Sequence, residues 1–299
     1  REAGGIHVRR SPFDPRVVDI LFIGGDGRDL PPASTQSIER LFSREDFPRA
    51  GPGGTGDINF PTRVVEGYRE HFLSEVSREL ISDRRFTLVV DFAYGTTTEV
   101  FPGLLGALRA ETVSLDAYAA PERLLRNREE FEAALQRLGG IVRSIDADLG
   151  FRVDPGGEVL HVVDDAGRPL SQELLQAVFV GLALEYLDVG RVAIPVTSPA
   201  VVARTIREHG ADVTWTKTEH HAMMASAEAV DLVAGARGEF IFPHFIPAYD
   251  AMFAAVRLLE ALAKAGVRLR EVADRYPPIH VVQDRVACPG GRKGAGMRR

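Results

Sequence analysis

The sequence predicts an α/β protein, and two observations carry this prediction. Residues 87–91 form a short continuous apolar run that ends in a carboxylate, which is typical of a strand buried on both faces of a parallel sheet. Segments with helical spacing and segments with strand patterns then alternate along the chain in two similar cycles. This alternation favours layers of helices packed against sheets.

The composition excludes several classes of protein. The 299 residues carry 36 Lys and Arg against 42 Asp and Glu, a net charge of −6, so bulk charge does not favour nucleic-acid binding. We expect no membrane span, because no apolar run approaches the roughly 20 residues that one needs. The single cysteine, Cys288, cannot form an internal disulfide, which fits a reducing compartment and predicts a cytoplasmic protein.

The first part of the chain is predicted to be half of a domain followed by a linker. Residues 17–23 have a strand pattern, residues 24–27 read Gly-Gly-Asp-Gly as a turn, and residues 34–41 have helical spacing. Residues 48–57 are rich in Gly and Pro, which indicates an exposed connection and a domain boundary. Because the first methionine is Met223, we interpret the sequence as a fragment of a longer protein.

The rest of the chain supplies the alternating elements. Gly139 and Gly140 are expected to stop a helix, and residues 141–143 after them have a strand-like pattern. The predicted helices span residues 64–81, 100–110, 129–138, 172–186, 200–209 and 249–265. The predicted strands span residues 87–91, 159–163, 191–196, 212–216 and 240–242.

Several residues could carry chemistry, although each also has a structural interpretation. Asp146 and Asp148 could share one Mg²⁺ ion, which prefers oxygen ligands, but aspartates are also common in turns. Ser11 could be a nucleophile or phosphate carrier, or part of an ordinary Ser-Pro turn. His220 and His221 are adjacent and therefore point apart, so a polar loop is favoured over a metal site.

Two segments could bind an anion. Arg237 and the backbone amides of residues 235–239 could hold one, or these residues could form a tight turn before the next strand. The basic, glycine-rich tail at residues 289–299 could be an anion-binding arm, but a flexible chain end is the favoured interpretation.

The order of these segments resembles the α-D-phosphohexomutase superfamily, which contains the phosphomannomutases and phosphoglucomutases. Residues 4–12 resemble the family's Gly-Gly-Ile-x-Ile-Thr-Ala-Ser-His-Asn loop without a gap, with Ser11 at the serine. Residues 146–151 resemble its Asp-Gly-Asp-Ala-Asp-Arg metal loop. Residues 238–242 and Asp250 resemble the end of its sugar-binding loop and the start of the helix that follows.

The resemblance implies a phosphohexomutase-like fold of consecutive α/β/α domains with mixed sheets. It divides the chain into the C-terminal part of a first domain at residues 1–56 and a second domain at residues 57–157 that ends in the metal-loop region. A third domain with the sugar loop takes residues 158–280, and residues 281–299 begin a truncated fourth domain.

The resemblance also implies an activity. Family members transfer phosphate between O1 and O6 of a hexose, through a bisphosphorylated sugar and an active-site phosphoserine beside Mg²⁺. By this resemblance Ser11 is the catalytic serine, and Asp146 and Asp148 hold Mg²⁺ at a weakened site. The expected ligand is a phosphorylated hexose. The substrate-binding residues implied are Arg9, Arg10, Lys217, Arg237 and Gly238.

Departures from the family pattern argue against an intact active site. Gly150 and Phe151 replace an aspartate and an arginine of the metal loop, and Gly235 and Arg237 replace the glutamate and serine of the sugar loop. Whether the chain is an enzyme therefore stays open. The chain is also similar to the mutase-like region of actinobacterial fusion chains. This similarity implies the alternative, a non-catalytic regulatory or interaction module of a mannose-1-phosphate guanylyltransferase in GDP-mannose biosynthesis, with a covalently linked nucleotidyltransferase domain as its partner.

Overall fold

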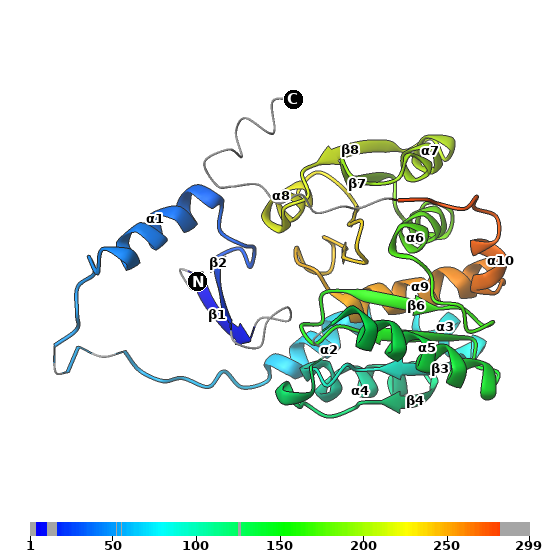
Figure 1. Ribbon diagram of the computed structural model, residues 1–299, viewed down its shortest axis with the longest axis horizontal. Helices are drawn as coiled ribbons and strands as arrows, with labels where there is room; N and C mark the ends of the chain where they lie inside the picture. Colours follow the sequence, from blue (N-terminus) through cyan, green and yellow to red (C-terminus); the bar gives the residue numbers. More distant parts are fainter. Residues whose placement is uncertain (1–3, 11–16, 52, 55, 125–126, 282–299) are drawn as a thin grey trace.

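The computed structural model describes residues 4–10, 17–51, 53–54, 56–124 and 127–281. They form an N-terminal segment that lies to one side and two α/β units that pack against each other (Figure 1). None of the helices in this described part of the chain is long and apolar enough to span a membrane. The predicted tail at residues 289–299 lies outside the described residues, as does nearly all of the expected fourth domain.

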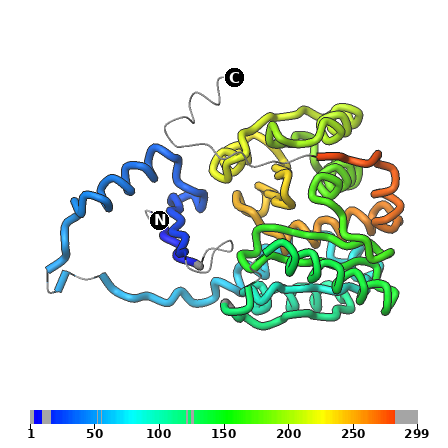
Figure 2. The backbone as a smooth tube through the Cα atoms, in the orientation of Figure 1, coloured from blue at the N-terminus to red at the C-terminus, as the bar shows by residue number. Residues whose placement is uncertain are grey.

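The N-terminal segment consists of a hairpin and a helix. β1 (Gly4–Arg10) pairs antiparallel with β2 (Val18–Gly24), and α1 (Pro32–Ser43) follows with no buried residue along its length. The strand and helix predicted at 17–23 and 34–41 are confirmed. The described residues between α1 and α2 are exposed and form no helix or strand, so the predicted connection is also confirmed (Figure 2).

The second unit is built on a mixed four-stranded sheet in the order β4-β3-β5-β6. β3 pairs parallel with β4 and β5, and β6 pairs antiparallel with β5, so this sheet extends beyond residue 157. The strands are β3 (Thr87–Asp91), β4 (Glu111–Leu115), β5 (Leu149–Val153) and β6 (Leu160–Val163). The helical elements are α2 (Val64–Ser74), α3 (Arg78–Arg84), η1 (Thr96–Glu99), α4 (Phe101–Ala107), η2 (Pro121–Arg123) and α5 (Arg128–Ser144).

The predicted end of α5 is wrong, because the helix continues through Gly139 and Gly140 to Ser144. A Cβ atom on Gly139 would lie only 2.3 Å from the backbone oxygen of Gly167. The glycine therefore permits close packing of the helix on a turn and does not end the helix. Residues 141–143 are consequently helical instead of strand-like, which changes the position of the residues that follow.

The third unit has a second mixed sheet, in the order β10-β9-β7-β8. α6 (Gln172–Tyr186) and β8 (Asp212–Thr216) have the predicted bounds, whereas His220 and His221 begin a helix instead of lying in a loop. The other strands are β7 (Arg191–Pro195), β9 (Leu232–Ala234) and β10 (Phe240–Ile241). The other helices are α7 (Ala200–Glu208), α8 (His220–Ser226), α9 (Ala251–Ala265) and α10 (Leu269–Ala273).

A single hydrophobic core joins the second and third units through α9, which crosses between them (Figure 1). Phe253 of α9 stacks on Phe245 with ring centroids 4.2 Å apart and meets Phe72 of α2 edge-on at 5.1 Å. The predicted helix at 64–81 is interrupted at residues 75–77. There Ser77 donates a hydrogen bond of 2.7 Å to buried Glu260 of α9, so this interruption also ties the two units together.

Candidate functional site

The loop at residues 154–159 leaves the carboxyl end of β5 and is rigidly held. The Asp154 carboxylate accepts hydrogen bonds from the backbone N–H groups of Gly156, Glu158 and Val159 at 3.1, 2.6 and 2.7 Å. Pro155 packs so closely that a Cβ on Gly95 would lie 2.6 Å from its Cα. Asp154 therefore organises the loop with its own oxygens, and burial raises the pKa of this carboxyl against the opposing effect of the hydrogen bonds.

Arg9 of β1 reaches across to this loop. Its Nη1 and Nη2 donate to the two carboxylate oxygens of Glu158 at 3.1 and 3.5 Å, and its Nε lies 3.9 Å from Asp19, the facing residue on β2. A Cβ on Gly156 would lie 3.0 Å from Arg9 Nη1. The missing side chain at this position leaves room for the guanidinium. Arg9, Asp154 and Gly156 line a cleft of about 350 Å³.

A second polar group lies at the carboxyl ends of β7, β8 and β9. Glu239 is buried, and its Oε1 lies 3.2 Å from Nη2 of Arg237 and 3.7 Å from Nε2 of His220. Burial alone would raise the pKa of Glu239, but the interaction with His220 and the charge of Arg237 outweigh it and hold that pKa below its ordinary value. Arg237, Glu239, Thr197 and Thr218 line a pocket of about 280 Å³.

The two loops are joined through the backbone. Leu160 N donates to the carbonyl oxygen of Gly238 at 2.9 Å, and Val159 forms an isolated bridge with Glu239. Gly238 has φ of 85°, and a Cβ there would lie 2.3 Å from the oxygen of Leu160. Gly238 is therefore required by this junction, whatever part it takes in binding a substrate.

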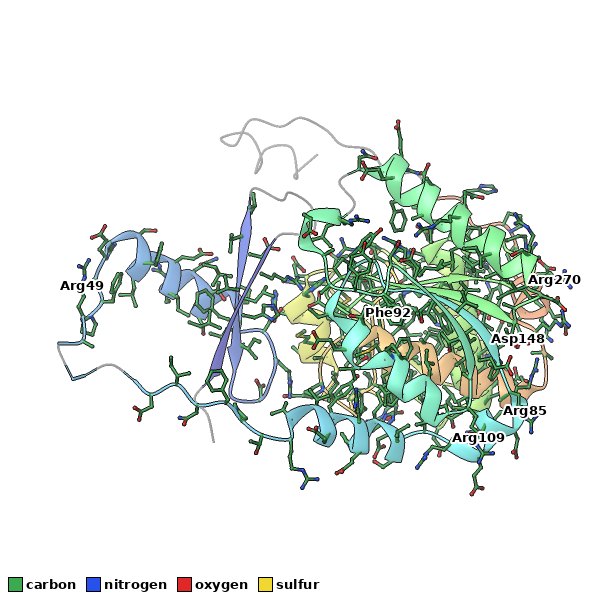
Figure 3. All side chains as sticks on the ribbon, turned by 90° about the horizontal axis from the view of Figure 1, so that it is seen from below. Arg49, Arg85, Phe92, Arg109, Asp148 and Arg270 are labelled. Atoms are coloured by element: carbon green, nitrogen blue, oxygen red, sulfur yellow. The ribbon has the colours of Figure 1, made fainter. Side chains whose placement is uncertain are left out.

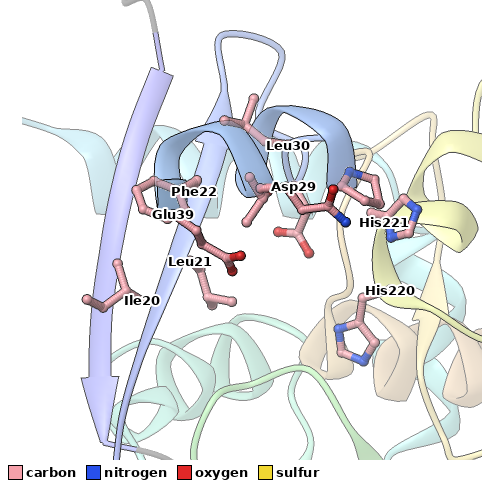
Figure 4. Close-up of a pocket in the computed structure, with 11 residues that line it drawn as sticks. Ile20, Leu21, Phe22, Asp29, Leu30, Glu39, His220 and His221 are labelled. Atoms are coloured by element: carbon pink, nitrogen blue, oxygen red, sulfur yellow. The ribbon is translucent and has the colours of Figure 1, made fainter. Parts of the chain in front are cut away.

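A third cavity, of about 400 Å³, separates the N-terminal segment from α8 (Figure 4). Asp29 and Glu39 lie on one side, and His220 and His221 on the other. Burial raises the pKa of Asp29 despite the nearby histidines. His220 thus lies between this cavity and Glu239, and the interaction with the Glu239 carboxylate raises the pKa of the imidazole.

Asp146 and Asp148 lie elsewhere. Asp148 accepts a 2.9 Å hydrogen bond from Thr87 N and a 3.1 Å bond from Arg84, while Asp146 is exposed. Both precede β5, at the amino end of the sheet, and Figure 3 places Asp148 on the side of the molecule away from the hairpin. A strand at residues 141–143 would instead have delivered them to the carboxyl edge of the sheet; because these residues are helical, Asp146 and Asp148 lie at its amino end.

These two residues also do not fit a shared Mg²⁺ ion. Both oxygens of Asp148 already have partners within the chain. Among the described residues no group of three or more His, Cys, Asp or Glu side chains is arranged to hold a metal ion. A hard cation that binds through charge and oxygen ligands therefore finds no adequate donor set at this place.

The remaining predicted residues include some that lie outside the described residues and one, Lys217, that the structure describes. Ser11 lies outside the described residues, as does the side chain of Arg10. Lys217 is exposed directly after β8, next to Thr218 of the 280 Å³ pocket. Sequence reasoning missed Glu158 and Glu239, the two carboxylates that hold Arg9 and Arg237. The Asp-Pro-Gly-Gly run at 154–157 was an available turn signal for the first of them.

Mixed sheets covered by helices, with polar loops at the carboxyl ends of their strands, define an α/β/α protein. The model of phosphoglucomutase/phosphomannomutase alpha/beta/alpha domain II matches residues 66–167, and that of domain III matches residues 175–279. The chain belongs to this phosphohexomutase family.

Individual relatives agree with this assignment. The phosphoglucomutase/phosphomannomutase of Thermococcus kodakarensis is 26% identical over 292 residues, 97% of this chain and 64% of the relative. A putative phosphomannomutase structure from Thermus thermophilus has a TM-score of 0.79 at 18% identity, covering 91% of this chain and 62% of that one. The chain thus spans just under two thirds of the length of these relatives.

A more distant structure contains ligands. It is the N-acetylphosphoglucosamine mutase of Aspergillus fumigatus, solved in complex with GlcNAc-6P and magnesium. Its TM-score is 0.52 at 13% identity, and the match covers 74% of this chain and 51% of that one. At this identity the likeness concerns the fold alone.

Proposed function

We propose that this chain is the sugar-phosphate-binding part of a phosphohexomutase-type protein. A hexose 1-phosphate or 6-phosphate binds at the carboxyl ends of β7, β8 and β9. The observation that carries this proposal is Arg237 at the 280 Å³ pocket, held by Glu239 while its side chain remains 64% exposed. In open α/β sheets ligands collect outside the carboxyl ends of the strands, and an arginine fork matches the geometry of a phosphate.

The charges around the pocket suit such a ligand. Glu239 remains ionised because its pKa is held low, so it fixes the guanidinium of Arg237 and accepts hydrogen bonds. The hydroxyls of Thr197 and Thr218 add donors and acceptors of the kind that sugar hydroxyls pair with. Lys217 adds a positive charge next to them.

The activity implied by the family is interconversion of hexose 1-phosphate and 6-phosphate through Ser11. We expect this chemistry to be weak, because Asp146 and Asp148 lie at the other end of the second sheet and Gly235 and Arg237 alter the sugar loop. The single cysteine supports a place in the cytoplasm.

Calorimetric titration with mannose 6-phosphate, mannose 1-phosphate and the two glucose phosphates tests the binding. We expect at least one to bind, and Arg237→Ala to weaken it by about tenfold or more, since charge-assisted hydrogen bonds are worth about 1.5–3 kcal/mol. Arg204→Ala, on the exposed face of α7, is the control and should bind normally. The proposal fails if no sugar phosphate binds, or if Arg237→Ala binds as tightly as the unmodified chain.

A second candidate is the regulatory or interaction module of a mannose-1-phosphate guanylyltransferase. The position of Asp148 favours it, since a phosphoryl-transfer site needs a cation near its serine and this carboxylate is far from the hairpin. A mutase assay with bisphosphorylated hexose separates the candidates. Turnover that falls in Ser11→Ala supports the mutase. Equal, negligible turnover in both chains, with a linked guanylyltransferase altered by deletion of this region, supports the module.

A further inference from the structure

The cleft at the carboxyl end of β5 already contains a cation that belongs to the chain. Arg9 approaches Glu158 with both terminal nitrogens, at 3.1 and 3.5 Å, and lies 3.9 Å from Asp19 through Nε. All three side chains are more than two thirds buried, with 23%, 26% and 30% of their surface exposed. This is a two-point arginine–carboxylate contact, the strong form of such a pair.

The other residues of the loop do not compete with Glu158 for the Arg9 guanidinium. Asp154, the other acid of the loop, satisfies its oxygens with three backbone N–H groups. Gly156 has no side chain, and a Cβ there would lie 3.0 Å from Arg9 Nη1 and 3.1 Å from Asp154 Oδ2. The guanidinium therefore occupies the space above the loop and directly faces the acid that could otherwise receive a metal ion.

β1, the strand that precedes Ser11 in the sequence, reaches this acidic cleft through Arg9. Arg9 precedes Ser11 by two residues, whereas the described structure places Asp146 and Asp148 at the opposite end of the sheet. A divalent ion in this cleft would have to use Glu158 and its neighbours. It would meet the positive charge of Arg9 within a few ångströms, where repulsion in a partly buried cleft is strong.

We propose that the Arg9 guanidinium takes the place of a divalent cation in this chain, so that its cleft at residues 154–159 is closed to Mg²⁺ by an internal ion pair with Glu158. The positive charge of Arg9 neutralises the acidic cleft. Nε of Arg9 is also buried without a hydrogen-bond partner among the described residues. The proposal does not depend on which sugar phosphate binds, because it concerns metal binding alone.

Mn²⁺, a paramagnetic stand-in for Mg²⁺, provides the test, and free Mn²⁺ is measured by electron paramagnetic resonance without any sugar. The unmodified chain should bind no Mn²⁺ stoichiometrically at about 1 mM, in the weak range for oxygen-ligand sites. Arg9→Thr, which suits a strand, should gain one Mn²⁺ site at least about tenfold tighter than any binding by the unmodified chain. Adding Glu158→Gln to that variant should abolish the gain.

Arg9→Lys is the matched control, because it keeps the positive charge and should remain without Mn²⁺. Circular dichroism checks that each variant is folded, and the lysine variant together with Glu158→Gln alone keeps the test decisive if Arg9→Thr does not fold. The proposal is overturned if the unmodified chain binds one Mn²⁺ and Glu158→Gln removes it, if folded Arg9→Thr gains nothing, or if Arg9→Lys binds Mn²⁺.

Discussion

Asp250 is predicted to make the stability of this protein depend on pH in a direction opposite to that of an ordinary carboxylate. It caps α9 by accepting a 2.8 Å hydrogen bond from Phe253 N, and it accepts a 2.6 Å bond from the hydroxyl of Tyr68 on α2. Burial raises its pKa from 3.8 to about 6, against the lowering effect of these hydrogen bonds. The shift of about two units corresponds to about 3 kcal/mol.

The sign follows from proton linkage. A folded-state pKa above the unfolded one means that the native protein binds the proton more tightly, so this stability is fully present below pH 3.8 and is lost as the pH rises through about 6. Between pH 8 and pH 5 the group should contribute about 1.4 kcal/mol in favour of the acidic condition. Asp250→Asn removes the titration while retaining an acceptor for the helix cap.

Urea unfolding of the unmodified chain and Asp250→Asn, each at pH 5 and pH 8, measures the effect. The variant should gain stability relative to the unmodified chain at pH 8, and this advantage should shrink by about 1.4 kcal/mol at pH 5. Asp83→Asn, at an exposed carboxylate of α3, should show no such difference. A stability difference between Asp250→Asn and the unmodified chain that is the same at both pH values would refute the reasoning.

Three further outcomes follow from buried contacts. Gly139→Ala should destabilise the folded protein by about 1–3 kcal/mol despite the helix propensity of alanine, because its Cβ would lie 2.3 Å from a backbone oxygen. A Cβ at Gly140 would meet nothing within 4 Å, so Gly140→Ala should be neutral or stabilising in the same denaturation assay. Glu260→Gln should cost about 3 kcal/mol in urea unfolding, since it leaves the Arg257 charge buried without its 2.6 Å partner. Burial lowers the pKa of His161 to about 4, so its NMR ring signals should stay constant from about pH 8 to about pH 5.5.

Local sequence pattern predicted the elements that local pattern controls. The apolar run at 87–91 is β3, the helical spacing at 172–186 is α6, and the Gly- and Pro-rich stretch at 48–57 is an exposed connection. Gly139, at the end of the 129–138 pattern, misled because its reason is a tertiary contact with Gly167. A helix end and a close approach between two backbone segments both favour glycine. Only the packing in the folded protein distinguishes the two cases.

The candidate site shows the same division. Arg9 and Arg237 could be singled out as cations from the sequence, but their carboxylate partners could not. Glu158 is 149 residues from Arg9 along the chain, and the pair depends on how the hairpin docks on the loop after β5. Glu239 and Arg237 are only two residues apart, yet their contact depends on the turn that Gly238 permits at positive φ.

The long connection between α1 and α2 affects how the hairpin opens and closes. The N-terminal segment is linked to the rest by polar contacts. Arg28 Nη1 lies 2.7 Å from Glu228, Asp29 N lies 3.5 Å from the sulfur of Met224, and Arg9 pairs with Glu158. These few contacts are small beside the hydrophobic core that joins the second and third units, so local opening of this segment requires far less free energy than global unfolding. The connection then acts as a tether, and Arg9 rebinds as an intramolecular ligand whose effective concentration is set by the length of that tether.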